Sequence, residues 1–137
     1  MAENEHPNAT VVREGFQAFA TGDMGWMNQH LANDIVWHVG GRSKLSGEYK
    51  GKEEVLNLFG RQAQIFSGAP DLELHEVLAN DEHAIAIGTA RAQDPDGGTV
   101  EWKFANVFHV KDGKATEVWG LADETSETDA LIDKLVT

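Results

Sequence analysis

The chain has 137 residues, of which 23 are acidic and 11 are basic, giving a formal net charge of −12 at pH 7. A surface this negative repels a phosphate backbone, so nucleic acid is not expected as a partner. Cysteine is absent, which excludes disulfides, thiolate metal sites and a cysteine nucleophile and favours a reducing, cytoplasmic location.

The length is that of one domain, and a chain of this size buries a core without cross-links. We expect a polar tail over residues 1–7 and a single domain over residues 8–137, because no linker, repeat or low-complexity tract divides the chain. No apolar run follows the acidic start, so a secretory signal is not expected. No window is apolar enough to span a membrane.

The first half of the chain is predicted to be mainly helical. Apolar residues recur at helical spacing over residues 8–22 and again over residues 23–31. Residues 35–39 are β-branched or aromatic and predict a strand, which runs into a glycine-rich loop over residues 40–51. A third helix is expected from about Lys52 until Gly68 and Pro70 stop it.

The second half changes to period-two patterns that turn signals separate at hairpin spacing. Strands are predicted over 71–80, 83–93, 99–111 and 114–123, followed by a last helix over 126–136. Several of these strands exceed the usual length, so the sheet must curl and enclose space. The element order predicts an α+β fold in which a cone-shaped, curved antiparallel sheet wraps around the N-terminal helices.

Three short phrases accompany this order: A-T-G-D at 20–23, L-A-N-D-I-V-W-H at 31–38 and K-D-G-K-A-T-E-V-W at 111–119. Together with the element order, they resemble the nuclear transport factor 2-like superfamily, and within it the SnoaL-like and ketosteroid isomerase-like branch. The resemblance covers about residues 8 to 136. It implies a barrel-like fold that holds a small apolar or oxygenated organic molecule inside its sheet.

The resemblance also implies a reaction class, a cofactor-free cyclase, isomerase or dehydratase acting on a polyketide-, terpenoid- or steroid-like ligand. The acidic positions of the branch are not acidic here. The base aspartate of the steroid isomerases falls on Val39, their second aspartate on Asn106 and their tyrosine near Gly15. The aspartate of SnoaL-type cyclases and limonene epoxide hydrolases falls on Gly120. A non-catalytic ligand-binding or accessory protein and a dimeric interaction module with a closed core are therefore alternatives.

Three residues are candidates for catalysis. The Asn106 amide would polarise a carbonyl, although it could instead bond a neighbouring backbone group. His38 would move a proton, because imidazole titrates near neutral pH. If Val39 faces inward, however, His38 faces outward unless a bulge shifts the register. Asp123 could act at the cavity mouth as an acid or base, or it could cap a helix.

Strand alternation predicts the ligand-binding wall. If Asn106 points inward, alternate residues of its strand and of the neighbouring strands point inward with it. The expected ligand-binding residues are Trp37, Val39, Trp102, Phe104, Val118 and Gly120.

No metal or cofactor is expected. His38, His75 and His109 lie on predicted strands and could form a three-histidine metal site, but the sequence has no His-x-His or helical His-x-x-x-His pair.

Alternation also leaves Trp119 on the outer face of the sheet, next to Val107. An apolar patch of this kind favours a homodimer in which a second subunit covers it. The alternative is that the final helix covers Trp119 within one chain.

Overall fold

The computed structural model describes residues 5–65, 71–123 and 126–136. The elements in chain order are α1 Pro7–Thr21, α2 Met24–His30, β1 Leu31–Val39, β2 Gly47–Lys50, α3 Lys52–Ile65, β3 Asp71–Ala79, β4 His83–Gln93, β5 Thr99–Lys111, β6 Lys114–Ala122 and α4 Ser126–Leu135.

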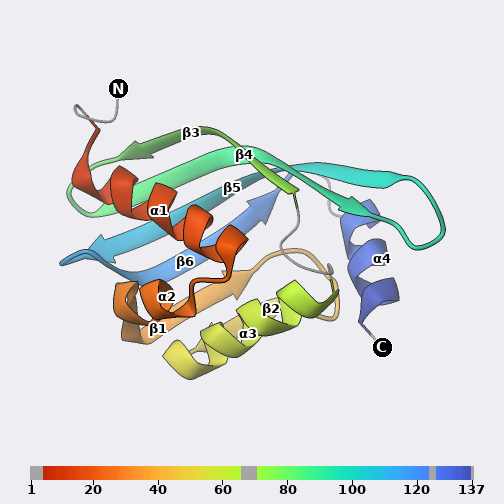
Figure 1. Cartoon of the computed structure of the whole chain (residues 1–137), viewed down its shortest axis with the longest axis horizontal. Coiled ribbons are helices and arrows are strands. Elements are labelled where there is room, and N and C mark those ends of the chain that lie inside the picture. Colours follow the sequence, from red (N-terminus) through yellow and green to blue (C-terminus); the bar gives the residue numbers. More distant parts are fainter. Residues whose placement is uncertain (1–4, 66–70, 124–125, 137) are drawn as a thin grey trace.

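Within these ranges the strands form one six-stranded sheet in the order β2-β1-β6-β5-β4-β3. All neighbours are antiparallel except β1 and β6, which run parallel. β2 and β3 are the edges, so the sheet is curved but not closed. α1 crosses the concave face, α2 and α3 lie beside it near β1, and α4 lies at the end where the β4–β5 hairpin projects (Figure 1). The predicted α+β fold with a curved sheet around the N-terminal helices is confirmed.

β4 carries small side chains on the concave face of the sheet, which leaves space for larger side chains of neighbouring elements. Ala84, Ala86, Ala90 and Ala92 are buried on one side of the strand, and Gly88 lies in the same series. A Cβ built on Gly88 would lie 2.4 Å from the carbonyl oxygen of Glu73 and 2.9 Å from the Phe104 ring. The Phe104 ring of β5 therefore packs over β4 at Gly88, where there is no side chain.

Aromatic rings of the helices and of the sheet form the core around this face. Phe16 of α1 packs on Phe104 with ring centroids 5.8 Å apart. Phe59 of α3 lies 5.6 Å from Phe19 and 5.0 Å from Trp37, each edge to face. These contacts fix α1 and α3 over the sheet, as edge-to-face and offset aromatic pairs do.

The predicted strands of the second half are confirmed to within one residue at their ends, and α4 ends one residue earlier than predicted. The first half differs more. β1 begins at Leu31 rather than residue 35, which ends α2 at His30. The glycine-rich loop contains β2, whose residues Gly47–Lys50 pair with β1. The predicted end of the third helix, at Gly68 and Pro70, lies outside the described residues.

The first helix begins one residue earlier than predicted. Pro7 occupies its first turn, where its missing N–H costs nothing, and the His6 ring accepts a hydrogen bond from the Asn8 N–H. None of the helices in the described part of the chain is long and apolar enough to cross a membrane.

Candidate functional site

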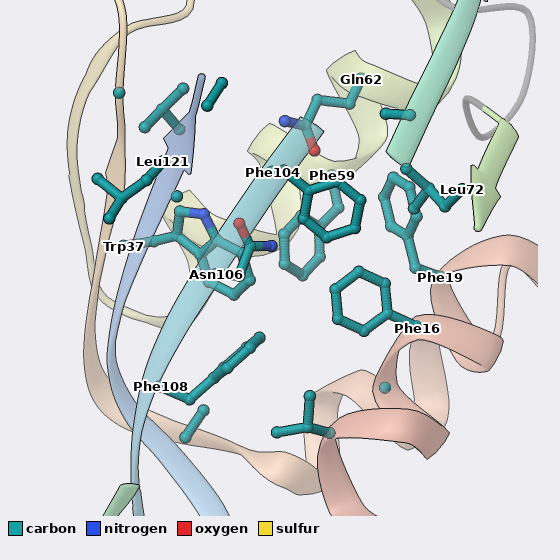
Figure 2. A pocket seen from close by; sticks show the side chains of 18 of the residues that line it. Phe16, Phe19, Trp37, Phe59, Gln62, Leu72, Phe104, Asn106, Phe108 and Leu121 are labelled. Carbon is teal, nitrogen blue, oxygen red and sulfur yellow. The ribbon is translucent and has the colours of Figure 1, made fainter. Parts of the chain in front are cut away.

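A cavity of about 270 Å³ lies between the concave face of the sheet and the helices. Apolar side chains make most of its wall, and eight of the lining residues are phenylalanine or tryptophan. α1 contributes Phe16 and Phe19, and the rings of Phe59, Phe104 and Phe108 face them from α3 and β5 (Figure 2). The space therefore suits a flat, largely apolar molecule that stacks against rings.

Asn106 brings a polar group into this apolar space. It lies on β5 opposite Ala86 of β4 and Gly120 of β6. Because neither neighbour has a large side chain, the carboxamide projects into the cavity between Trp37 and the phenylalanine rings (Figure 2). Within the described residues, its side chain forms no hydrogen bond. The amide N–H groups can therefore donate to a ligand, and the amide oxygen can accept.

Gln62 supplies a second carboxamide, which sequence reasoning missed. It lies on α3 and points toward the cavity from the wall facing β5 (Figure 2). The signal was its spacing, because Gln62 follows Phe59 by three positions and shares its helix face.

The positions that the family resemblance singled out all line the cavity. Gly15, Val39, Asn106 and Gly120 contribute to its wall. A Cβ on Gly15 would lie 3.4 Å from the Trp26 ring, so indole already occupies the space beside this glycine. The places where the relatives have a phenol or carboxylates are here apolar, apart from the Asn106 amide.

The other predicted ligand-binding residues divide into two groups. Trp37, Trp102 and Phe104 line the cavity with Asn106. Val118 faces the same side of the sheet but is 0% exposed and belongs to the packed core. The contribution of these side chains to ligand affinity stays a prediction.

The structure does not bring His38 to the cavity. Its Nε2 lies 2.8 Å from Glu117 Oε2 and its Nδ1 3.4 Å from Glu48 Oε2. The imidazole stacks on Trp119, with centroids 5.2 Å apart and an angle of 6° between the rings. This is the outer face of the sheet, as alternation predicts when Val39 points inward. The two carboxylates and the indole account for the position of the ring.

Asp123 lies at the end of the β5–β6 ladder. Its Oδ1 accepts a hydrogen bond from the Lys103 N–H at 3.0 Å, and its own N–H donates to the Lys103 carbonyl at 3.1 Å. It is not among the residues that line the cavity. Its carboxylate thus extends strand pairing by one residue past the end of β6.

His30 lines the cavity, and sequence reasoning did not single it out. Its ring stacks on Trp26 at 3.9 Å, and its Nδ1 lies 2.8 Å from the Trp26 carbonyl oxygen. A carbonyl oxygen only accepts, so Nδ1 carries the proton and Nε2 is the basic nitrogen. Met27 lies three positions earlier on the same helix face, which is the signal that could have identified His30.

α4 closes one end of the cavity with Thr128 and Ile132. Two carboxylates hold it to the loop that follows β1. Asp129 Oδ2 accepts from the Arg42 N–H at 2.9 Å, and Asp133 Oδ1 accepts from the Lys44 N–H at 2.6 Å.

A salt bridge holds α4 from the other side. Lys134 Nζ lies 2.8 Å from Asp94 Oδ1 in the β4–β5 turn and 2.9 Å from Asp96 Oδ2. The hydrogen bond from the Lys134 ammonium lowers the pKa of Asp94, and in return it raises the pKa of Lys134.

The described residues contain no group of three or more histidine or acidic side chains placed to hold a metal ion. His38 and His109 both contact the Trp119 ring, whereas His75 is on β3 near the opposite edge of the sheet. The three histidines that suggested a metal site therefore do not converge.

The outer face carries the apolar patch that Trp119 and Val107 predict. Leu78, Ile85, Val107 and Trp119 lie in register across β3, β4, β5 and β6. Leu78 is 50% exposed. α4 lies against the cavity, on the other side of the sheet, so it does not cover this row. We call these four residues the outer row.

The comparisons with known proteins agree with the fold. A family model described as a SnoaL-like domain matches residues 12–118, which is most of the chain, so the chain belongs to the SnoaL-like family. The uncharacterized protein Mb0035 of Mycobacterium bovis is 31% identical over 109 residues, covering 79% of this chain and 82% of that protein.

Solved structures place the chain in the nuclear transport factor 2-like superfamily. Bal32a, from a soil-derived mobile gene cassette, has a TM-score of 0.85 and 28% identity, covering 92% of this chain and 96% of its own. An NTF2-like protein from Burkholderia pseudomallei has a TM-score of 0.79 and 27% identity, with coverages of 93% and 98%. TerC, co-crystallized with polyporic acid, has a TM-score of 0.79 and 21% identity, with coverages of 93% and 99%, and shows the fold alone.

Proposed function

We propose that the chain binds a neutral organic molecule of one or two rings and that the Asn106 amide donates a hydrogen bond to a carbonyl oxygen of this ligand. One observation carries the proposal. A carboxamide without a hydrogen-bond partner among the described residues lies inside a cavity lined mainly by apolar side chains, eight of them phenylalanine or tryptophan. A hydrogen bond from this amide to a ligand carbonyl would contribute about 0.5–1.5 kcal/mol to binding, net of the bonds to water that it replaces.

The size of the cavity supports a small ligand. Its volume of about 270 Å³ lies just below the range of about 300–1,000 Å³ that is usual for ligand sites. Within the polyketide-, terpenoid- and steroid-like classes, this volume favours a two-ring molecule over a four-ring one. TerC, which shares the fold, was co-crystallized with polyporic acid, so an organic ligand is compatible with this architecture.

The charge of the chain supports a neutral ligand. The net charge is −12, and the cavity-lining residues of the described chain include no lysine or arginine that could pair with an anion. An anionic ligand would be repelled on approach and would find no charged partner inside.

His30 supports a second candidate function, proton transfer on the bound ligand. For a ligand with a C=C bond between the β- and γ-carbons, Nε2 could take a proton from the α-carbon while Asn106 donates to the oxygen of the resulting dienolate. Returning that proton to the γ-carbon would move the double bond to the α,β position. The net change would be an isomerisation without a cofactor, which is one of the reactions that the family resemblance implies.

We test binding with a matched pair of probes, tetralin and 1-tetralone, which differ in one carbonyl. Isothermal titration calorimetry should show tighter binding of 1-tetralone to the wild type by about five- to tenfold, the contribution of one hydrogen bond. Asn106→Leu should remove the difference, and His38→Ala, on the outer face, should keep it. Equal affinity of the wild type for both probes would contradict the role of Asn106, and absence of binding by both would contradict the cavity proposal.

Catalysis is tested separately by exchange of the α-protons of 1-tetralone with deuterium, followed by NMR. A protein-catalysed exchange rate that disappears in His30→Asn while 1-tetralone still binds would support proton transfer. Exchange no faster than in buffer would contradict proton transfer by the protein and would support binding alone.

A second copy of the chain is the partner that we propose for the outer face. The outer row gives each copy an apolar strip across four strands, and a two-fold axis would bury one strip against the other.

A further inference from the structure

Thr128 carries an unpaired polar atom at the α4 end of the cavity. The residue is only 7% exposed and lines the cavity. Its hydroxyl oxygen is buried and has no hydrogen-bond partner among the described residues. A buried hydroxyl without a hydrogen-bond partner lowers folding stability by about 1–3 kcal/mol, and such groups are rare in native proteins.

The hydroxyl is held in a defined place. Thr128 lies in the first turn of α4, directly before Asp129, whose carboxylate binds the Arg42 N–H at 2.9 Å. Asp133 and Lys134 tie the following turns to the loop after β1 and to the β4–β5 turn. Asn106 is on the sheet wall, so the two residues line the cavity from different elements.

The surroundings of Thr128 select the charge of its partner. The first turn of α4 contains the carboxylates of Glu127 and Asp129. An anionic group beside Thr128 would meet Asp129, which also lines the cavity, and would gain no cation in exchange. The partner is therefore neutral, a hydroxyl or a carbonyl.

We infer that the ligand carries a second neutral oxygen function, a hydroxyl or carbonyl, and that the Thr128 hydroxyl binds it while Asn106 binds the first. The inference rests on the proposed function and narrows it, because it makes the ligand a ring molecule with two separated oxygen groups. A threonine hydroxyl both donates and accepts, so it serves either kind of oxygen.

The experiment uses 1-tetralone and its three hydroxy derivatives, which are isomers of one another with the hydroxyl at position 5, 6 or 7, titrated calorimetrically into the wild type and Thr128→Val. Valine has the shape of threonine without the hydroxyl. At least one isomer should bind the wild type about five- to tenfold more tightly than 1-tetralone does, and Thr128→Val should lose this gain while keeping its affinity for 1-tetralone. Thr116→Val is the matched control, because Thr116 donates to the His109 carbonyl and does not line the cavity.

The outcomes separate this inference from the proposed function. If 1-tetralone binds but no hydroxyl isomer binds more tightly, or if Thr128→Val keeps the gain, the second contact is refuted and the cavity proposal stands. If none of the four compounds binds the wild type, both are refuted. The stability of Thr128→Val without ligand is an independent test. Its melting temperature should equal or exceed that of the wild type, and a drop of several degrees would show that the hydroxyl has a structural partner and would overturn the inference.

Discussion

Replacing Asn106 by leucine should make the ligand-free protein more stable. The carboxamide is half-buried in an apolar cavity and forms no hydrogen bond within the described chain. Leaving an amide in such a place costs about 1 kcal/mol, the lower end of the range for unpaired polar groups, because the side chain is not fully buried. Leucine removes this cost, and the cavity of about 270 Å³ has room for its methyl groups.

The size of the effect follows from the length of the chain. A domain of 137 residues has an unfolding entropy near 0.3 kcal/mol/K, so 1 kcal/mol corresponds to an increase of about 3–4 °C in melting temperature. Differential scanning calorimetry of the ligand-free proteins measures it. The same change at Asn80 is the control, since Asn80 Oδ1 accepts from the N–H groups of Glu82 and His83 at 2.9 and 2.8 Å.

Asn80→Leu should therefore lower the melting temperature by about 3–7 °C, which corresponds to two lost hydrogen bonds. The two variants should move in opposite directions. If Asn106→Leu falls as far as Asn80→Leu does, Asn106 has a structural partner, and its assignment as a ligand-binding group is refuted.

Three further predictions concern the packing, the docking of α4 and the outer face. Gly88→Ala should destabilise the fold by about 2 kcal/mol in urea denaturation, because the added methyl group would lie 2.4 Å from the carbonyl oxygen of Glu73. Gly120→Ala is the control for stability. Its methyl group would lie 3.5 Å from the Asn106 side chain, so this variant should keep nearly the same stability and bind 1-tetralone more weakly. The lowered pKa of Asp94 means that its bond to Lys134 contributes at neutral pH and is lost as pH falls from about 4 through that pKa. The protection of α4 amides, corrected for the intrinsic pH dependence of exchange, should therefore fall with acid in the wild type and not in Lys134→Met, where α4 is already loosened. Val107→Glu should shift a dimer to monomer in analytical ultracentrifugation, and a wild type that is monomeric at all concentrations would refute the dimer.

The strands of the second half could be predicted from the sequence because short turns of a few neighbouring residues connect them. Residues with positive φ mark them, as Gly97 and Gly98 do in one turn and Asp112 and Gly113 in the next. Alternation then gave the inward face of β5 correctly. The strand β2 was missed because its partner is β1, and pairing across a glycine-rich loop leaves no periodic signal in four residues.

The site was predictable only where strands form it. With Asn106 taken as inward, as the family resemblance implies, alternation predicts Trp102 and Phe104 in the cavity wall, and with Val39 inward it predicts His38 on the outer face. His30, Gln62 and Thr128 were missed because each is a polar residue on a helix face that is otherwise apolar, and periodicity counts apolar residues. Thr128 lies three positions before Leu131, which is 1% exposed, so its burial was implied by helical spacing.

Alternation also has a limit at the end of β6. It predicts that Leu121 faces away from the cavity, yet Leu121 is 53% exposed and contributes to the cavity wall (Figure 2). Leu121 is the next-to-last residue of β6 and lies at the rim of the cavity, where residues of either facing can contribute to the wall. Side-chain direction at such an end depends on twist, which the sequence pattern does not encode.

The four tryptophans provide the most direct measurement of where a ligand binds. Trp26, Trp37 and Trp102 line the cavity, and Trp119 lies on the outer face. A ¹H–¹⁵N NMR titration with 1-tetralone should shift indole N–H signals of the first three, together with the side-chain amide of Asn106, and leave Trp119 unchanged. A titration that shifts Trp119 and leaves the cavity indoles and Asn106 in place would contradict the account.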